Sequence, residues 1–211
     1  MIILLAVLAV IAAYLLGSIN FAVIFTRAYK NTDIREQGSG NAGTTNVMRV
    51  GGVVPGLLTF FGDALKGFAA CMIGKLIFAH VAEVYDFTVF LPLSGAYICG
   101  VFCMFGHICP LFFNFKGGKG VATAVGIFAV CCPIAVIIGL AVFALVTLLS
   151  KYVSLGSLTA TVAVVVLATV FPLDNTPVII QVICCLIMAL MIFYKHRGNI
   201  KRLLSGTERK I

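Results

Sequence analysis

Three polar stretches that contain glycine interrupt a chain that is otherwise apolar. The first runs from Gly38 to Arg49, the second from His107 to Gly120 and the third from His196 to Asn199. Hydroxyl, amide and cationic side chains beside glycine are groups that bind phosphate, because glycine lets backbone N–H groups approach an anion. If the three stretches meet at one face of a membrane, they form a phosphate-handling site.

The first stretch is dense in hydrogen-bond donors. Its candidate anion ligands are Gly38, Ser39, Gly40, Asn41, Thr44, Thr45, Asn46 and Arg49. Arg49 can bind a phosphate through two parallel hydrogen bonds. A polar loop without a function would have a similar composition, so that alternative stays open.

The glycine spacing of the first stretch also matches a dinucleotide-binding fingerprint. Gly38, Gly40 and Gly43 fit G-x-G-x-x-G, and Asp63 follows twenty residues after Gly43. That fingerprint works only between a strand and a helix of a βαβ unit. Here a charged loop, residues 27–37, precedes the glycines and an apolar span follows them, which excludes dinucleotide binding.

The second stretch ends in Lys116-Gly117-Gly118-Lys119-Gly120 and opens a predicted helix at Val121. Free N–H groups, the helix dipole and two ammonium groups then point at one place, where anions bind. It is not a P-loop, because Gly120 stands where the loop needs Ser or Thr and Phe113 where it needs Gly. The alternative is a turn at the membrane border with lysines on the cytoplasmic side.

His107 and His196 lie at predicted cytoplasmic helix ends, and both could titrate near neutral pH. Each is either a hydrogen-bonding anchor or a base. Asn199 shares a face with His196 if the last helix continues through it.

Two opposite charges stand three residues apart in the second apolar run. Asp63 and Lys66 lie on one face of the predicted helix. A charge inside a membrane is often functional, but a pair can also pin one helix to another. The sequence leaves both interpretations open.

The composition determines the class of protein. Of the 211 residues 62% are hydrophobic and 10% charged, and the mean hydropathy is +1.15. This leaves too little polar surface to cover a soluble globule. We therefore expect an all-α polytopic membrane protein, with residues 1–211 forming one domain. The first apolar run lacks a basic leading segment and a cleavage site, so it is predicted to remain as a span.

Seven of the eight cysteines lie in apolar runs, where cysteine usually packs as a small hydrophobic residue. No C-x-x-C pair occurs, so no metal site is predicted. The sequence also lacks G-x-S-x-G and H-E-x-x-H patterns, which disfavours serine hydrolase and zinc chemistry. We expect no cofactor and no nucleic-acid partner.

A spanning helix needs about 20 apolar residues. Runs of this length occupy residues 2–25, 53–79, 88–106 and 176–194, and Lys151 and Tyr152 divide the longer run 121–171. Six spans would place the basic C-terminal tail opposite the basic loop after the first helix, against the positive-inside tendency. A further crossing is therefore needed.

A helix break at Pro133 allows that further crossing. A short helix from about Gly120 to Cys131 would rise and a second, from about Ile134 to Ser150, would return. At about 18 Å the short helix must be sheltered by protein. The prediction is about seven transmembrane helices including one half-span, with the N-terminus outside and the C-terminus cytoplasmic; five or six helices are the alternatives. Connections near Glu83 to Asp86 and near Asp174 carry no Lys or Arg and are predicted to lie outside.

Together the three stretches resemble the signatures of the bacterial acyl-phosphate:glycerol-3-phosphate acyltransferases, and the similarity extends over nearly the whole chain. The resemblance implies transfer of an acyl group from acyl phosphate to the 1-hydroxyl of glycerol 3-phosphate, giving 1-acylglycerol 3-phosphate. It also implies a multi-pass protein of the bacterial inner membrane, in contact with lipid, whose active site faces the cytoplasm. The oligomeric state stays open.

The resemblance also implies roles for individual residues. It assigns Ser39, Arg49, His196 and Asn199 to catalysis, and Glu208 to a structural role. Predicted substrate ligands are Gly38, Gly40, Asn41, Thr44, Asn46, Lys66, His107, Gly117, Gly118, Lys119 and Gly120. The loop Gly117 to Gly120 would hold the phosphate of glycerol 3-phosphate.

Acyl phosphate is a mixed anhydride with a good leaving group, so positioning and anion stabilisation matter more than a strong base. We expect direct attack by the hydroxyl, with the donor phosphate or His196 taking the proton; an acyl-enzyme at Ser39 is the alternative. A membrane transporter of anionic solutes is a rival function, although these stretches cluster at one face and a transporter site lies near the midplane. A scaffold protein is a third.

Overall fold

The structure is a computed structural model that describes residues 2–85, 91–171 and 177–211. Throughout these ranges the regular elements are helices, as predicted. Within the described ranges six segments are long and apolar enough to cross a membrane: α1 (Ile2–Gly17) with α2 (Phe21–Lys30), α4 (Val53–Tyr85), α5 (Pro92–Ile108) with the 3₁₀ turn η2 (Leu111–Phe113), α7 (Pro133–Ser150), α8 (Val153–Val170) and α9 (Val178–Lys195). The predictions for Asp86 and Asp174 lie outside the described residues.

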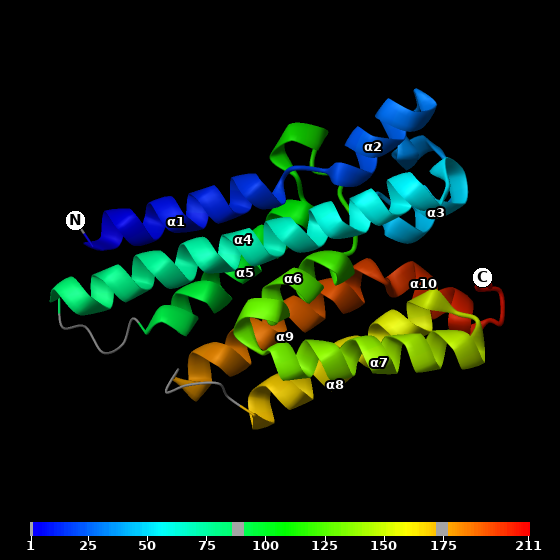
Figure 1. Ribbon diagram of the computed structural model, residues 1–211. Coiled ribbons are helices and arrows are strands. Elements are labelled where there is room, and N and C mark those ends of the chain that lie inside the picture. Colours follow the sequence, from blue (N-terminus) through cyan, green and yellow to red (C-terminus); the bar gives the residue numbers. More distant parts are fainter. Residues whose placement is uncertain (1, 86–90, 172–176) are drawn as a thin grey trace.

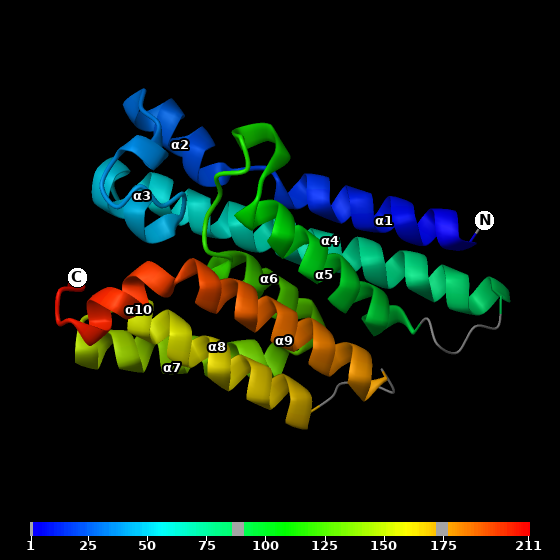
Figure 2. The ribbon, with the colours of Figure 1, turned by 180° about the vertical axis from the view of Figure 1, so that it is seen from behind.

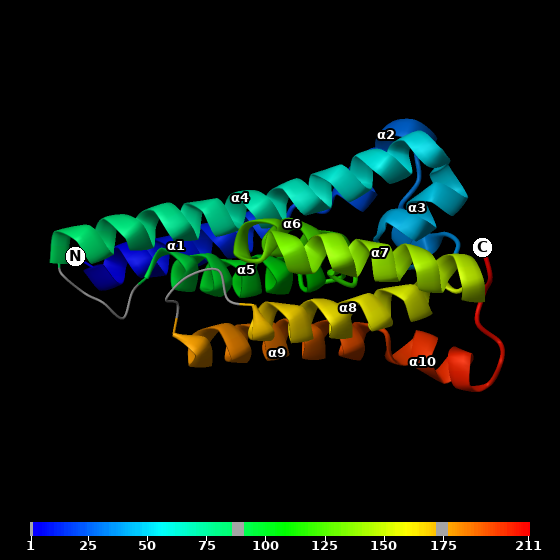
Figure 3. The same ribbon diagram turned by 60° about the horizontal axis from the view of Figure 1, so that its bottom comes forward.

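The helices form two groups that run roughly side by side (Figures 1 and 2). In the first group α1, α4 and α5 pack against one another, and in the second α8 packs against α7 and α9. Figure 3 shows α4 on one side of the molecule and α8 and α9 on the other. Contacts of α5 with α9, and of α6 (Val121–Cys131) with helices of both groups, join the two.

Pro133 separates two helices, as predicted. α6 ends at Cys131 and α7 begins at Pro133, which occupies the first helical turn where its missing N–H costs no hydrogen bond. The short α6 is sheltered by α4: a Cβ added at Gly126 would overlap the backbone carbonyl of Ala64. α6 therefore lies backbone to backbone against a long helix and does not face lipid alone.

The first apolar run is not the single helix 2–25 that its hydropathy predicts. α1 ends at Gly17, and Asn20 caps α2 by accepting a hydrogen bond from the Val23 N–H at 3.2 Å. Ser18 Oγ donates to the carbonyl of Tyr14 at 2.9 Å. Such short polar side chains compete for backbone groups and interrupt a helix, an effect that average hydropathy does not register.

Two further segments differ from the predicted loops. The predicted charged loop 27–37 contains the end of α2 and a 3₁₀ turn, η1 (Ile34–Glu36), and the first polar stretch includes a helix, α3 (Thr44–Gly51). α4 has 33 residues and continues past the predicted end at 79. At 1.5 Å per residue it is about 50 Å long, well beyond a hydrocarbon core of about 30 Å, and so supports α3 outside it.

All eight cysteines are free thiols, and every one except the half-buried Cys109 is buried. Five of them (Cys71, Cys131, Cys132, Cys184 and Cys185) belong to the main apolar core. Cysteine acts there as a small hydrophobic residue, as predicted.

Candidate active site

One large cavity of about 1570 Å³ is lined by all three polar stretches. In Figure 1 the elements that carry these stretches, including α3 and α10 (Arg197–Leu204), lie toward the same end of the molecule. Thirteen predicted site residues line the cavity: Gly38, Ser39, Gly40, Asn41, Thr44, Asn46, Arg49, His107, Gly117, Lys119, Gly120, His196 and Asn199. Gly118 and Lys66 are not part of its lining.

Asn46 organises the first stretch. Its side chain is 1% exposed and accepts a hydrogen bond from the Ser39 N–H at 2.9 Å. The same amide donates to the carbonyls of Gln37 at 2.9 Å and Asn41 at 3.1 Å. This amide therefore holds the loop together. The structure leaves it no unused N–H with which to bind substrate, as the sequence had predicted it would.

Groups with unused hydrogen-bonding capacity lie in and beside that loop. The Arg49 guanidinium is exposed and has no hydrogen-bond or ion-pair partner among the described residues. The Thr44 hydroxyl, in the first turn of α3, is buried without a hydrogen-bond partner. The N-terminus of α3, the Thr44 hydroxyl and Arg49 are therefore all available to an anion in the cavity.

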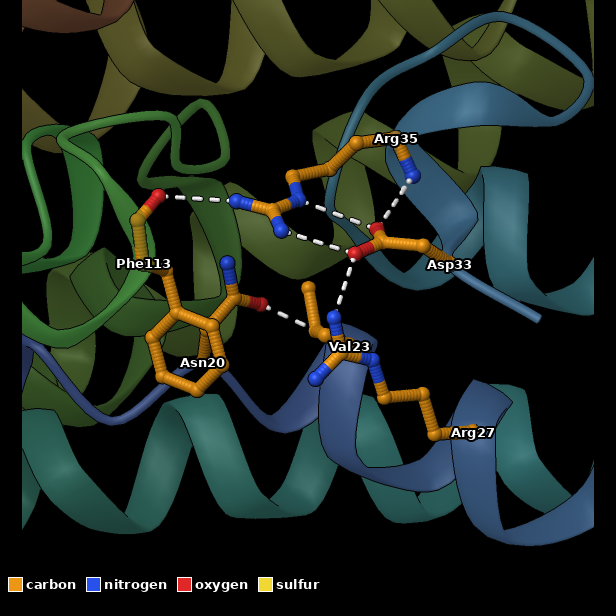
Figure 4. A network of polar contacts seen from close by, with 6 residues as sticks. All are labelled: Asn20, Val23, Arg27, Asp33, Arg35 and Phe113. Atoms are coloured by element: carbon orange, nitrogen blue, oxygen red, sulfur yellow. Dashed lines mark hydrogen bonds and ion pairs between the residues drawn. The ribbon is translucent and has the colours of Figure 1, made fainter. Parts of the chain in front are cut away.

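An ion-pair network ties the charged segment just before the first stretch to the second stretch (Figure 4). Asp33 accepts hydrogen bonds from Arg35 at 2.7 and 2.9 Å and from Arg27 at 2.9 Å. These hydrogen bonds, above all those from Arg35, hold the pKa of Asp33 well below its ordinary value. Arg35 also donates to the Phe113 carbonyl at 2.7 Å, in η2 (Leu111–Phe113), which fixes the two loops together. The sequence analysis did not predict the Arg35–Phe113 contact, because these two residues are far apart in the chain.

The second stretch folds back on the end of α5. The Gly117 and Gly118 N–H groups donate to the carbonyls of Ile108 and His107, each at 3.2 Å. Gly120 caps α6 in the left-handed conformation, with φ +88°. α6 thus begins at the cavity wall with its first N–H groups without intrahelical partners, as the sequence predicted for an anion site.

Lys119 is held by the third stretch. Its Nζ donates to Asn199 Oδ1 at 2.5 Å, and Asn199 Nδ2 donates to Glu208 Oε1 at 2.7 Å. Burial lowers the pKa of Lys119 to about 8, although the Glu208 carboxylate counteracts the shift. The ammonium group is therefore charged at neutral pH but titrates at mildly alkaline pH.

Glu208 anchors this arrangement to α8 and α10. It accepts hydrogen bonds from Ser154 Oγ at 3.0 Å and from Arg202 Nε at 2.7 Å. Burial alone would raise the pKa of this carboxyl, but the hydrogen bonds from Asn199, Arg202 and Ser154 outweigh it and leave the pKa lowered. The structural role expected for Glu208 agrees with these contacts.

His196 stands at the junction where α9 ends and α10 begins, so the last helix does not continue straight through it. Its Nδ1 lies 2.9 Å from the Ile192 carbonyl, which can only accept a hydrogen bond. Nδ1 therefore carries the hydrogen and Nε2 is an acceptor. Burial, together with the charge of Lys119, lowers the pKa of His196 to about 4. Among these neighbours His196 is therefore neutral at pH 7, which differs from the prediction that it could titrate near neutral pH.

Lys66 and His107 meet at Asp63. Asp63 Oδ1 lies 2.7 Å from Lys66 Nζ and 3.4 Å from His107 Nδ1. Lys66 Nζ also donates to the Ile19 carbonyl at 2.7 Å, at the break between α1 and α2. The pair therefore pins α4 to that break, which is the structural interpretation left open by the sequence.

The cavity continues from its polar mouth into an apolar depth between α6, α7, α8 and α9. The residues that line this depth include Val125, Phe128, Val136, Leu140, Phe143, Val164, Val165, Met188 and Ile192. The sequence analysis named none of them. Each belongs to a helix that is apolar on all sides, so periodicity does not reveal which face meets the cavity.

The cavity therefore places cationic and N–H donor groups at the end of an apolar channel, a shape that fits an amphiphile with an anionic head. The family model for glycerol-3-phosphate acyltransferase matches residues 7–206 of the chain. The chain belongs to this family. Family membership makes it an acyltransferase and an integral membrane protein.

Individual relatives agree with the family match. The glycerol-3-phosphate acyltransferase of Thermoanaerobacter sp. (strain X514) is 44% identical over 206 residues, covering 98% of this chain and 96% of the relative. The crystal structure of PlsY (YgiH), an integral membrane glycerol 3-phosphate acyltransferase, in its glycerol 3-phosphate form superposes with a TM-score of 0.83 at 36% identity. The lysophosphatidic acid form of PlsY superposes with a TM-score of 0.81 at 35% identity. Each of the two comparisons covers 98% of this chain and 95% of the PlsY chain.

Proposed function

We propose that this protein transfers a fatty acyl group from acyl phosphate to the 1-hydroxyl of glycerol 3-phosphate, giving 1-acylglycerol 3-phosphate and phosphate. The observation that carries the proposal is the continuity of one cavity from a cationic mouth to an apolar depth. Such a cavity accommodates two anionic head groups side by side with an acyl chain below them. The names of the relatives and of the two PlsY structures support the acceptor and the product.

The reaction balances without a cofactor. The glycerol oxygen forms a bond to the acyl carbon, the bond from that carbon to the phosphate oxygen breaks, and the hydroxyl proton leaves with the phosphate. Because the mixed anhydride already has a good leaving group, the protein has to bring two anions together and stabilise the developing charge.

Two sides of the mouth would share this task. Lys119, supported by Asn199 and the N-terminus of α6, would hold the phosphate of glycerol 3-phosphate. Arg49, Ser39 and the N-terminus of α3 would hold the donor phosphate and its carbonyl oxygen. Gly38, Gly40, Asn41 and Thr44 would contribute N–H, amide and hydroxyl groups from the same loop.

The proton acceptor in this proposal is the donor phosphate. A phosphate monoanion has a pKa near 6, whereas burial and the charge of Lys119 lower the pKa of His196 to about 4. The phosphate is therefore the better acceptor, and His196 Nε2 would orient glycerol 3-phosphate by accepting a hydrogen bond from its 2-hydroxyl, which leaves the proton of the 1-hydroxyl free to pass to the phosphate. Ser39 Oγ has no neighbouring base among the hydrogen bonds described, which supports direct attack over an acyl-enzyme.

The distribution of charge supports a cytoplasmic mouth in the bacterial inner membrane. Of the 15 Lys and Arg residues, Arg35, Arg49, Lys116, Lys119, Lys195, Arg197, Arg202, Arg209 and Lys210 line the cavity. The positive-inside tendency assigns such an end to the cytoplasm. With α6 counted as a half-span the chain would cross seven times, which leaves the N-terminus outside.

The test is phosphate release by the purified protein in lipid, given palmitoyl phosphate and glycerol 3-phosphate. We expect release only when both substrates are present, and none when palmitoyl-CoA replaces palmitoyl phosphate. Release from palmitoyl-CoA, or release without glycerol 3-phosphate, contradicts the proposed reaction. If folded protein is inactive with every donor, uptake of glycerol 3-phosphate into vesicles would test the transporter alternative.

A further inference from the structure

A buried polar group lies directly behind the glycine loop and takes no part in the proposed reaction. Asp63, Lys66 and His107 are 1%, 2% and 5% exposed. Their contacts, 2.7 Å from Lys66 to Asp63 and 3.4 Å from His107 to Asp63, join α4 to the end of α5. Burying ionisable groups in a membrane protein is costly, so the arrangement needs a reason.

His107 contacts the loop with both its backbone and its ring. The His107 carbonyl accepts the hydrogen bond from the Gly118 N–H at 3.2 Å. A Cβ added at Gly118 would overlap His107 Nε2 and the Ala42 carbonyl, so the ring lies directly under the loop backbone. The orientation of this ring therefore influences the path of residues 117–120, of which Gly117, Lys119 and Gly120 line the cavity.

The Asp63 carboxylate fixes that ring. Its Oδ1 lies 3.4 Å from His107 Nδ1, an electrostatic contact that favours the tautomer with the hydrogen on Nδ1. Lys66, tied to the Ile19 carbonyl at 2.7 Å, contacts the same carboxylate oxygen at 2.7 Å. The group thus forms a continuous polar connection from the break between α1 and α2 to the glycine loop.

We propose that Asp63 and His107 are positioning residues, which hold the loop 117–120 in the shape that binds the phosphate of glycerol 3-phosphate. The inference rests on the proposed function. Both residues act through the loop, and Lys66 balances the buried charge of Asp63. Losing the connection should therefore weaken acceptor binding more than it slows the chemical step.

Two substitutions of His107 separate positioning from simple packing. His107→Asn keeps an N–H group near the place of Nδ1 but loses ring volume, whereas His107→Phe keeps a ring and loses the polar contact with Asp63. We expect His107→Phe to raise the KM for glycerol 3-phosphate about tenfold, because the ring then loses its electrostatic contact with the buried carboxylate. His107→Asn should stay within about threefold of wild type, and kcat should change less than KM in both. The opposite ranking of the two variants would overturn the proposal.

A second pair of variants avoids an unpaired buried charge. Asp63→Asn with Lys66→Met keeps an acceptor for His107, and Asp63→Leu with Lys66→Met removes it; both leave a neutral interior. We expect the KM for glycerol 3-phosphate to rise about tenfold only in the Leu variant. Equal KM values in the two double variants would refute the role of Asp63.

Thr59→Val is the matched control on α4. Thr59 is 0% exposed and its hydroxyl bonds only within the helix, to the Pro55 carbonyl at 2.8 Å. Its kinetics should equal those of wild type, and thermal unfolding in detergent checks that every variant is folded. Wild-type turnover in the same assay tests the proposed function separately, so an active wild type with unaffected His107 and Asp63 variants rejects this inference alone.

Discussion

The mouth and the depth of the same cavity are built in different ways. At the mouth, side chains from loops far apart in sequence are fixed by specific contacts such as the Lys119–Asn199–Glu208 series. The depth is an apolar space left between helices that pack by shape, and polar side chains in its wall, such as Ser157 and Thr161, bond within their own helix. Rate and head-group binding should therefore depend on the mouth, and selectivity for the acyl chain on the depth.

Among changes at the mouth, removing the Lys119 side chain should cause the largest loss of activity. Lys119→Ala deletes the buried cation proposed to hold the acceptor phosphate, and we expect kcat/KM for glycerol 3-phosphate to fall at least about 100-fold. Steady-state phosphate release measures this. Lys201→Ala is the control, because Lys201 is exposed on α10 and is not part of the cavity lining. A loss below about threefold in Lys119→Ala would remove Lys119 from the site.

Arg49→Lys should give the next largest effect. A lysine keeps the charge but cannot make two parallel hydrogen bonds to a phosphate, so we expect activity to fall about 10- to 100-fold with unchanged thermal stability. Arg27→Lys is the matched control, since Arg27 is bound to Asp33 outside the cavity. Turnover near that of wild type in Arg49→Lys would contradict the proposed contact.

The pH dependence of acceptor binding tests the charge of Lys119. Because burial lowers its pKa to about 8, the ammonium group is present below that pH and is lost above it. We expect the KM for glycerol 3-phosphate to rise above pH 8, by up to about tenfold per pH unit. Lys119→Arg, which stays charged, should abolish this rise even if its KM is higher at pH 7. A KM that is flat from pH 7 to 9.5 in the wild-type enzyme would show that Lys119 does not control it.

The smallest effect should come from the depth and should change selectivity alone. Val165 lines the cavity, whereas its neighbour Val166 is 53% exposed on the outer face of α8. Val165→Phe should reduce the rate with palmitoyl phosphate relative to lauroyl phosphate about fivefold, because each buried methylene contributes about 0.8 kcal/mol. Val166→Phe should leave the ratio unchanged. Equal ratios in the two variants would place the acyl chain elsewhere.

The helices were predictable where one strong physical signal acts. The lengths of the apolar runs predicted the spans, and Pro133 predicted the junction of α6 and α7 to within a residue. The break between α1 and α2 was not predicted, because it depends on the local bonds of Ser18 and Asn20 inside an apolar run. α3 was missed because its eight residues include two Thr, two Val, an Asn and a Gly, all of low helix propensity, and its stability comes from packing on α4.

The candidate site was predictable at its mouth and not in its depth. Residue types suited to phosphate pointed to Lys119, Arg49 and Asn199, which the fold brings to one cavity. The sequence did not reveal that Asn46 serves the loop, because its partners are backbone groups. Nor did it reveal the pKa of His196, which follows from burial and from Lys119.

The dependence of Lys119 on Asn199 and Glu208 has a consequence for biosynthesis. Ribosomes make the chain from its N-terminus, so the six long spans and α6 leave the ribosome before residues 196–208. Until Glu208 reaches Ser154 and Asn199, the acceptor side of the mouth lacks its supports. We therefore expect a nascent chain that is already inserted in the bilayer to gain activity only when its last stretch has been translated.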